Sequence, residues 1–420
     1  MVAAPASGSG KTMITLGLLR ALKNRGVRVA SAKVGPDYID PQFHQAASGQ
    51  PCFNLDPWAM SPAMAAGLLG ELDADIVIVE GVMGLFDGPQ NARGSTADLA
   101  RDLGLPIILV LDASHQAQSI AALAQGFINY QDGLNFAGII LNCVASDRHA
   151  DLLGVALAPL NVPILGAVRR DDSLKWPSRH LGLVQALENQ QLETFIESVS
   201  LAVARETKLD NLLTIGAELR LAGANHFILP PLGQRIAIAH DLAFSFAYPH
   251  ILGNWQKSGA ELSFFSPLNN EAPNPSADAV FLPGGYPELQ AGVLAQSHNF
   301  IAGLRNSMAL IYGECGGYMV LGDAIIDAEG ETHAMAGLLP LTTSFATRKL
   351  HLGYRQLTPL GGPWTKPLRA HEFHYSTIEN EGKADRLFSA SDATGNRLGE
   401  IGLRRGQVMG SYAHVICEAP

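Results

Sequence analysis

The chain has 420 residues, of which 47% are hydrophobic and 16% are charged, so it is long enough for two or three domains with large cores. Its formal net charge of −10 argues against a nucleic-acid or an anionic-membrane partner. The four cysteines are widely scattered and lack metal-ligand spacing, which indicates reduced thiols. With no signal-peptide pattern and no apolar run of about 18 residues, we expect a soluble, cytoplasmic protein.

A glycine-rich segment near the amino terminus has the setting of a phosphate-binding loop. Residues 4–12 read Ala-Pro-Ala-Ser-Gly-Ser-Gly-Lys-Thr, between a short apolar strand and an amphipathic helix. Lys11 is expected to reach the terminal phosphates of a nucleotide, and the Thr12 hydroxyl to ligate Mg²⁺. Pro5 departs from the full motif, which has glycine there, and an ordinary glycine turn is the alternative. The residues expected to hold the phosphates from the helix amino terminus are Ser7, Gly8, Ser9 and Gly10.

A second strand is predicted at residues 27–34, and an acidic loop follows it at residues 35–41. Lys33 lies at the end of this strand, where α/β sheets bind their ligands. Asp37 and Asp40 are expected to hold Mg²⁺ or to position a substrate. The alternative is that both carboxylates only cap backbone N–H groups of the turn.

The next predicted strand, at residues 75–80, ends in Glu80 and leads into a glycine-rich loop at residues 81–88. A carboxylate at the end of a buried parallel strand in a phosphate-loop protein holds Mg²⁺, directly or through water. Asp87, just before Gly88, is expected to contact substrate or metal, with a plain turn residue as the alternative.

Further strands are predicted at residues 105–111, 136–141 and 162–168, alternating with helical segments. This alternation predicts a parallel, doubly wound sheet. Asn142, at the end of one strand, would read an adenine edge or simply cap the loop. We predict a phosphate-loop domain at residues 1–186, a linker with one or two helices at 187–233, and a second domain at 234–420.

The second half restarts the α/β pattern, with strands predicted at 235–240, 261–265, 279–282 and 309–312. Cys315 then stands in a strand–turn–helix segment with the layout of a nucleophile elbow. The following helix is expected to favour its thiolate. The N–H groups of Gly316 and of Gly285, in the Pro-Gly-Gly loop after residue 282, are expected to form an oxyanion hole. A small buried structural cysteine is the alternative.

A cysteine nucleophile needs a base, and the sequence pattern alone does not choose one. The second half offers eight histidines, which are His240, His250, His298, His333, His351, His371, His374 and His414. Two places stand out, His414 and the polar segment His-Glu-Phe-His-Tyr-Ser at residues 371–376. That segment lacks the His-Glu-x-x-His spacing, so we predict no zinc site in it.

Together these motifs resemble the family of cobyrinic and hydrogenobyrinic acid a,c-diamide synthases, over essentially the whole chain. The fold that this resemblance implies is a dethiobiotin-synthetase-like phosphate-loop domain followed by a class I glutamine amidotransferase-like α/β domain. The most specific segments are residues 4–12, 33–41, 79–88, 179–183, 243–246, 282–288, 312–319 and 371–376.

The resemblance implies that ATP and Mg²⁺ activate a corrin carboxylate as an acyl phosphate, while Cys315 releases ammonia from glutamine. Ammonia, added or released from glutamine, then converts the a and c acetate side chains of cobyrinic acid into amides. The resemblance also picks His414 as the base. The usual His-x-Glu pattern would need a glutamate where Ile416 stands, and Glu372 is a weak substitute for it. The implied partners are small molecules, with a homodimer plausible and no nucleic acid or membrane.

Several alternatives stay open at this point. The ring is expected to be cobyrinic acid, with hydrogenobyrinic acid or a nickel-bearing reduced sirohydrochlorin as alternatives. Cobyric acid synthase is a rival within the same class, against which stand the loop after Glu80 and the modest length. A regulatory phosphate-loop ATPase with a degenerate amidotransferase-like tail is a rival from another class. The presence of both Cys315 and His414 argues against that ATPase.

Overall fold

The computed structural model describes residues 1–90, 93–174, 191–218 and 229–420. The chain divides into two compact units, Met1–His226 and Phe227–Pro420, and each is described by itself. The segment at residues 179–183, one of those that carry the family resemblance, lies outside the described residues.

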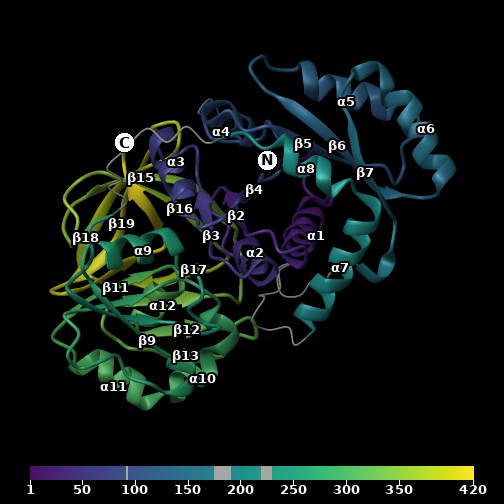
Figure 1. The fold of residues 1–420 in the computed structure, drawn as a ribbon. Helices are drawn as coiled ribbons and strands as arrows, with labels where there is room; N and C mark the ends of the chain where they lie inside the picture. Colours follow the sequence, from purple (N-terminus) through teal and green to yellow (C-terminus); the bar gives the residue numbers. More distant parts are fainter. Residues whose placement is uncertain (91–92, 175–190, 219–228) are drawn as a thin grey trace. The chain divides into compact units, whose positions relative to one another are not determined.

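The first unit is built on a seven-stranded sheet in the order β3-β2-β4-β1-β5-β6-β7, and every neighbouring pair is parallel (Figure 1). This confirms the predicted parallel, doubly wound sheet. Strand β3 was not predicted, because its four residues lie between two prolines and are too short to show a pattern. The strands are β1 Val2–Ala3, β2 Val29–Val34, β3 Cys52–Leu55, β4 Ile76–Glu80, β5 Ile107–Asp112, β6 Phe136–Val144 and β7 Ile164–Arg169.

The helices of the first unit follow the strands in alternation. Helix α1 starts directly after the glycine-rich loop and buries its apolar face, including Leu18 and Leu22, against the sheet. The α-helices are α1 Lys11–Asn24, α2 Asp40–Ser48, α3 Pro62–Gly70, α4 Thr96–Leu103, α5 Ile120–Asn129, α6 Asp147–Leu157, α7 Leu192–Glu206 and α8 Leu209–Ile215. Two 3₁₀-helices, η1 Ala158–Leu160 and η2 Asp172–Leu174, flank β7.

Helices α7 and α8 fall within the predicted linker at residues 187–233, and both pack on the first unit. Helix α7 lies beside α1 (Figure 1), where a Cβ atom added to Gly17 would come within 2.4 Å of Val203 Cγ2. The buried Arg20 of α1 forms ion pairs with Glu193 and Glu197 of α7. These contacts attach both helices to the first unit. The predicted domain limits stay a prediction.

The second unit is built on a ten-stranded mixed sheet in the order β21-β16-β15-β18-β19-β20-β11-β10-β8-β9. The five strands from β20 to β9 are parallel to one another, and the others pair antiparallel. Its strands are β8 Arg235–Ala239, β9 Glu261–Phe265, β10 Ala279–Leu282, β11 Leu310–Glu314, β15 His351–Pro359, β16 Leu368–His374, β18 Asp385–Ser391, β19 Arg397–Arg405, β20 Val408–Ser411 and β21 His414–Glu418.

A four-stranded sheet in the order β13-β12-β14-β17 and a set of short helices complete the second unit. Its strands are β12 Ala324–Ile326, β13 Thr332–Ala334, β14 Leu341–Ser344 and β17 Thr377–Glu381. The helices are α9 Pro249–Lys257, α10 Ala291–Gln296, α11 His298–Asn306 and α12 Gly316–Leu321, with 3₁₀-helices η5 Pro267–Asn269 and η6 Pro287–Gln290. Among the described residues, no helix has the length and apolar character needed to cross a membrane.

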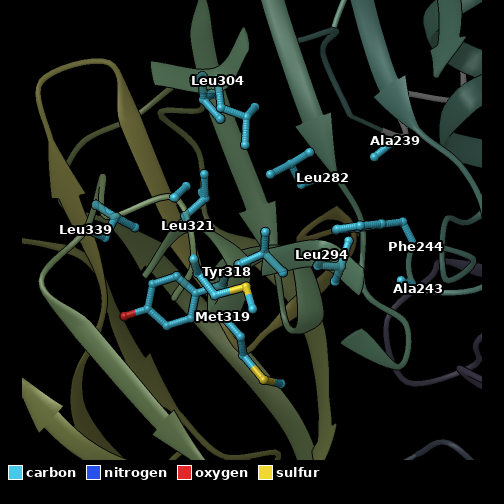
Figure 2. Packing of buried hydrophobic residues seen from close by; sticks show 14 of the residues in the cluster. Ala239, Ala243, Phe244, Leu282, Leu294, Leu304, Tyr318, Met319, Leu321 and Leu339 are labelled. Atoms are coloured by element: carbon cyan, nitrogen blue, oxygen red, sulfur yellow. The ribbon is translucent and has the colours of Figure 1, made fainter. Parts of the chain in front are cut away.

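The core of the second unit lies around α12, the helix that follows Cys315. Tyr318, Met319 and Leu321 of α12 belong to one buried cluster with Leu282 of β10 and Leu294 of α10 (Figure 2). Burying each such side chain contributes about 1.5–3 kcal/mol of hydrophobic free energy. This packing fixes the start of α12, and with it the turn that carries Cys315.

Candidate active sites

The glycine-rich loop of the first unit is closed by a contact from the neighbouring strand β6. Gly10 precedes α1 with φ of 93°, and a Cβ atom there would lie 2.1 Å from Asn142 Nδ2. Only glycine fits both this conformation and this approach. Asn142 Nδ2 donates a hydrogen bond of 3.0 Å to the Ser9 carbonyl oxygen. Asn142 therefore braces the loop in this structure, and its predicted recognition of adenine stays a prediction.

Lys11 is held inside the loop by main-chain oxygens. Its Nζ donates to the carbonyl oxygen of Ala6 at 3.1 Å and to that of Met83 at 2.5 Å. Burial lowers the pKa of Lys11, and the nearby Lys33 charge lowers it further. The ammonium group is thus placed where the loop after β4 meets the glycine-rich loop.

The predicted Mg²⁺ ligands meet at the carboxyl edge of the sheet. Lys33 on β2 and Glu80 on β4 are direct neighbours in the strand register. Lys33 Nζ lies 2.8 Å from Glu80 Oε1 and 2.6 Å from Asp40 Oδ2. The Thr12 hydroxyl donates to Glu80 Oε1 at 2.7 Å and to Asp40 Oδ2 at 3.3 Å. One cluster therefore joins residues from α1, α2, β2 and β4.

The second oxygen of Glu80 contacts a residue that the sequence analysis missed. His44 Nε2 lies 2.6 Å from Glu80 Oε2, and His44 Nδ1 lies 3.5 Å from the sulfur of Cys52 on β3. Both His44 and Glu80 are fully buried. His44 stands four residues after Asp40 in α2, a spacing that puts both on one helix face. That spacing was the available signal, but it does not reveal the partner on β4.

The charges of this cluster stabilise one another. Burial raises the pKa of Glu80, but the positive charges of Lys33 and His44 outweigh it and hold the pKa below its usual range. Burial lowers the pKa of Lys33, but the Asp40 and Glu80 carboxylates outweigh it and raise the pKa. In the same way, the contacts with Cys52 and Glu80 outweigh burial and raise the pKa of His44 to about 10. The buried carboxylate and ammonium are therefore both ionised at neutral pH.

The other two predicted acidic residues lie in the loops around this cluster. Asp37 Oδ1 accepts hydrogen bonds from the N–H groups of Ile39 at 2.7 Å and Asp40 at 3.2 Å, so it caps the start of α2. Burial and the Asp40 charge raise the pKa of Asp37 to about 7. Asp87 Oδ2 accepts from the Gly84 N–H at 2.7 Å, in the loop after β4. Both carboxylates thus make the turn contacts that were the alternative, and a ligand role for either stays a prediction.

The donor atoms in this cluster suit Mg²⁺. Thr12 offers a hydroxyl oxygen, and Asp40 and Glu80 offer carboxylate oxygens, which are the hard ligands that this ion prefers. One carboxylate oxygen of Asp40 and one of Glu80 already face a cationic group, the ammonium of Lys33. These residues therefore fit the ion chemically.

In the second unit, Cys315 occupies a strained turn between β11 and α12. Its φ of 46° and ψ of −104° are unusual for a residue with a side chain, and such strain is typical of functional turns. The Cys315 N–H donates to the carbonyl oxygen of Ser411 at 2.8 Å, which fixes the turn to the end of β20. A Cβ atom on Gly317 would come within 1.9 Å of the Leu282 carbonyl oxygen, so the next turn of chain admits only glycine.

The turn brings Cys315 and His414 to the same glycine. A Cβ atom on Gly284 would lie 2.3 Å from His414 Cε1, 3.1 Å from His414 Nε2 and 3.3 Å from Cys315 Cβ. Nearby, a Cβ atom on Gly316 would lie 3.1 Å from the Gly285 nitrogen. The two predicted oxyanion-hole segments therefore lie against each other beside the sulfur.

The protonation state of Cys315 differs from the expected one. Burial raises the pKa of Cys315, and the Glu288 charge raises it further, so the resting residue is a thiol. The expected thiolate is therefore corrected, because the N–H of Gly316 does not offset burial at a side chain only 4% exposed. Burial, helped by His371 and His374, lowers the pKa of His414 to about 3. His414 is thus a neutral imidazole that can accept a proton.

Glu372, the substitute third member that the resemblance suggested, is bound elsewhere. Its Oε2 accepts from Arg355 Nε at 2.7 Å, and its Oε1 lies 2.9 Å from His374 Nε2. His351 on the neighbouring strand brings a ring nitrogen within 4.8 Å of the side-chain ligand atoms of Glu372 and His374. All three side chains line a cavity of about 260 Å³. The 371–376 spacing does not reveal this cluster, because β15 supplies one member. In this structure Glu372 forms an ion pair with Arg355 and contacts His374, and the absence of a zinc site stays a prediction.

Comparisons with known proteins agree with two functional halves. Residues 1–184 match the model of the CobQ/CobB/MinD/ParA nucleotide binding domain, and residues 235–420 match that of the CobB/CobQ-like glutamine amidotransferase domain. A hydrogenobyrinate a,c-diamide synthase from Brucella anthropi is 56% identical, covering 99% of this chain and 98% of the relative. Proteins of the same name from Rhizobium meliloti and Rhodobacter capsulatus are 51% and 50% identical, with the same coverage.

Proposed function

The chain belongs to the family of hydrogenobyrinate a,c-diamide synthases, and from this premise we propose that it amidates two carboxylates of a corrin ring with ATP and glutamine. The observation that carries the proposal is the presence of two different reactive clusters in one chain. The carboxyl edge of the first sheet joins Lys33, Glu80 and Thr12, and the second unit places Cys315 beside a neutral histidine. A phosphate site alone would leave the cysteine unexplained.

The first unit prepares the carboxylate. Lys11 and the N–H groups at the start of α1 bind the phosphates of ATP. Thr12, Asp40 and Glu80 would hold Mg²⁺, which neutralises phosphate charge when bound. Lys33 adds a fixed positive charge at the same edge. An acetate oxygen of the ring then attacks the terminal phosphorus, which leaves an acyl phosphate and ADP.

The second unit supplies ammonia. His414 takes the Cys315 proton, and the thiolate attacks the side-chain amide carbon of glutamine. The N–H groups of Gly285 and Gly316 stabilise the oxyanion that forms. Ammonia leaves with the proton from His414, and water hydrolyses the thioester to glutamate. The ammonia then displaces phosphate from the acyl phosphate, and the product is an amide.

The ring substrate is the finer part of the proposal. We propose the a and c acetate groups of cobyrinic acid as the sites of amidation, as the sequence motifs suggest. The name shared by the relatives supports hydrogenobyrinic acid as a second candidate. Both rings carry the same two acetate groups, so the residues proposed here have the same roles with either.

A substrate panel tests the proposal. The purified protein is given ATP, Mg²⁺ and glutamine with cobyrinic acid, hydrogenobyrinic acid or nickel-sirohydrochlorin, and mass spectrometry counts the amides. Two amides on one of the first two rings support the function and identify the substrate. Two amides only on the nickel ring would support the proposed reaction with a different substrate. ATP hydrolysis with no amide on any ring contradicts the proposal.

A variant tests the division of labour. Cys315→Ala should lose glutamine-driven synthesis and keep synthesis driven by added ammonia, because the first unit needs only ammonia. Loss of both activities in a folded variant would contradict the division. A cytoplasmic location, where ATP and glutamine are available, and a homodimer are also part of the proposal. Cell fractionation and light scattering test them.

A further inference from the structure

The histidine proposed as the base needs a partner for its second ring nitrogen. Amidotransferases with the His-x-Glu pattern carry that partner two residues later, and here the position holds Ile416, a buried apolar residue. A neutral histidine carries its proton on only one of the two ring nitrogens. A hydrogen-bond acceptor beside one nitrogen holds the proton there and leaves the other nitrogen with a lone pair. An acceptor at Nδ1 favours the form whose Nε2 can accept the thiol proton.

Glu314, the residue before Cys315, brings a carboxylate to this place. It ends β11 and is 3% exposed. Its Oε2 lies 3.8 Å from His414 Nδ1, and its Oε1 accepts the Val415 N–H at 3.0 Å. The carboxylate is therefore anchored to the residue that follows His414, with its other oxygen directed to the histidine ring.

The two ring nitrogens of His414 face different groups. Nε2 lies on the Gly284 side, beside Cys315, and Nδ1 lies on the Glu314 side. At 3.8 Å the contact with Glu314 is longer than a hydrogen bond, as is common for catalytic pairs in the absence of substrate. Glu372, another carboxylate of this region, is held by Arg355 and His374.

We propose that Glu314 is the positioning residue of the glutaminase site. Its carboxylate accepts a hydrogen bond from the Nδ1–H of His414, so the proton stays on Nδ1 and the Nε2 lone pair is directed to Cys315. The Cys315 proton moves to Nε2, and Glu314 stabilises the imidazolium until that proton leaves with ammonia. This inference rests on the proposed function, and it assigns the role of the His-x-Glu glutamate to a residue on another strand.

The surroundings favour a partner whose charge responds to the histidine. Burial raises the pKa of Glu314 to about 8, and the Val415 N–H and the side chain of Tyr312 lower it in part. Around His414 stand His371, paired with it across β16 and β21, together with His374 and Glu372. A positive charge forming on His414 favours the ionised form of Glu314.

The test compares Glu314→Gln with a matched control, Glu418→Gln, at the other end of β21. Glutaminase kcat and KM are measured from pH 6 to 9, together with ammonia-driven synthesis. We expect Glu314→Gln to lower kcat by about 100-fold or more, with KM within about two-fold and an altered pH profile. The control should keep wild-type kinetics. Wild-type kcat and pH profile in Glu314→Gln would overturn the inference.

A second measurement does not depend on the folding of Glu314→Gln. Nitrogen-15 NMR of the histidines in the wild-type protein, with the His414 signals assigned from His414→Asn, reports which nitrogen carries the proton. We expect the proton on Nδ1, and a proton on Nε2 would overturn the inference. Ammonia-driven synthesis separates the two failures. If the inference alone fails, synthesis continues and Glu314→Gln hydrolyses glutamine normally, whereas failure of the proposed function leaves every ring unamidated.

Discussion

Glu80→Gln gives a direct test of the buried cluster at the carboxyl edge of the first sheet. The change keeps the size of the side chain and removes the negative charge that faces Lys33 at 2.8 Å and His44 at 2.6 Å. Breaking a buried ion pair by removing one partner costs about 3–5 kcal/mol. Because Asp40 still lies 2.6 Å from Lys33, we expect the lower end, about 3 kcal/mol.

Stability and activity are read separately in this experiment. For a unit of this size, about 3 kcal/mol lowers Tm by roughly 6–12 °C. Synthesis should be lost with glutamine and with ammonia, because both depend on the acyl phosphate, while glutaminase activity should remain. Asp75→Asn, before the other end of β4, is the matched control. It removes half of a solvent-exposed pair with Arg28, and water screens such pairs, so we expect its Tm to stay close to that of the wild type. Normal ammonia-driven synthesis by a folded Glu80→Gln variant would refute the assignment.

Three further outcomes are expected. Gly284→Ala places a methyl group 2.3 Å from His414 Cε1, so glutamine-driven synthesis should fall at least about 10-fold while ammonia-driven synthesis stays normal. A glutamine-driven rate equal to that of the wild type would contradict the placement of the His414 ring. Gly10→Ala combines φ of 93° with a 2.1 Å approach to Asn142, so ATP affinity measured by calorimetry should fall, and an unchanged affinity would argue against this loop. Burial lowers the pKa of His250 from 6.5 to about 4. Between these two pH values the unfolded state binds more protons than the folded state. The free energy of unfolding therefore falls by up to about 3 kcal/mol as the pH drops through this window. His250→Gln should flatten the pH dependence of the denaturation midpoint, and an unflattened curve would contradict this cause.

The strands and turns with strong local patterns could be predicted from the sequence. Four apolar residues fix β10 at Ala279–Leu282 as predicted, and the apolar run before Glu80 predicts β4 to within one residue. The antiparallel strands are different. Strand β19, Arg397–Arg405, exposes most of its first five residues and has no apolar run, so only its pairing with β18 and β20 defines it.

Short segments of the sequence already specify much of the chemistry of both sites. Glycine-Lys-Thr before a helix and Glu-Cys-Gly-Gly after a strand need specific residues at fixed spacing, because a phosphate or a nucleophile must be approached by the main chain. The tertiary structure decided which distant groups complete each cluster. His44 on α2 meets Glu80 at the end of β4, and Glu314 meets His414 because β11 ends, and β21 begins, near the same turn. Those contacts, and the burial that keeps Cys315 a thiol, depend on folding of the whole sheet and leave no local pattern in the sequence.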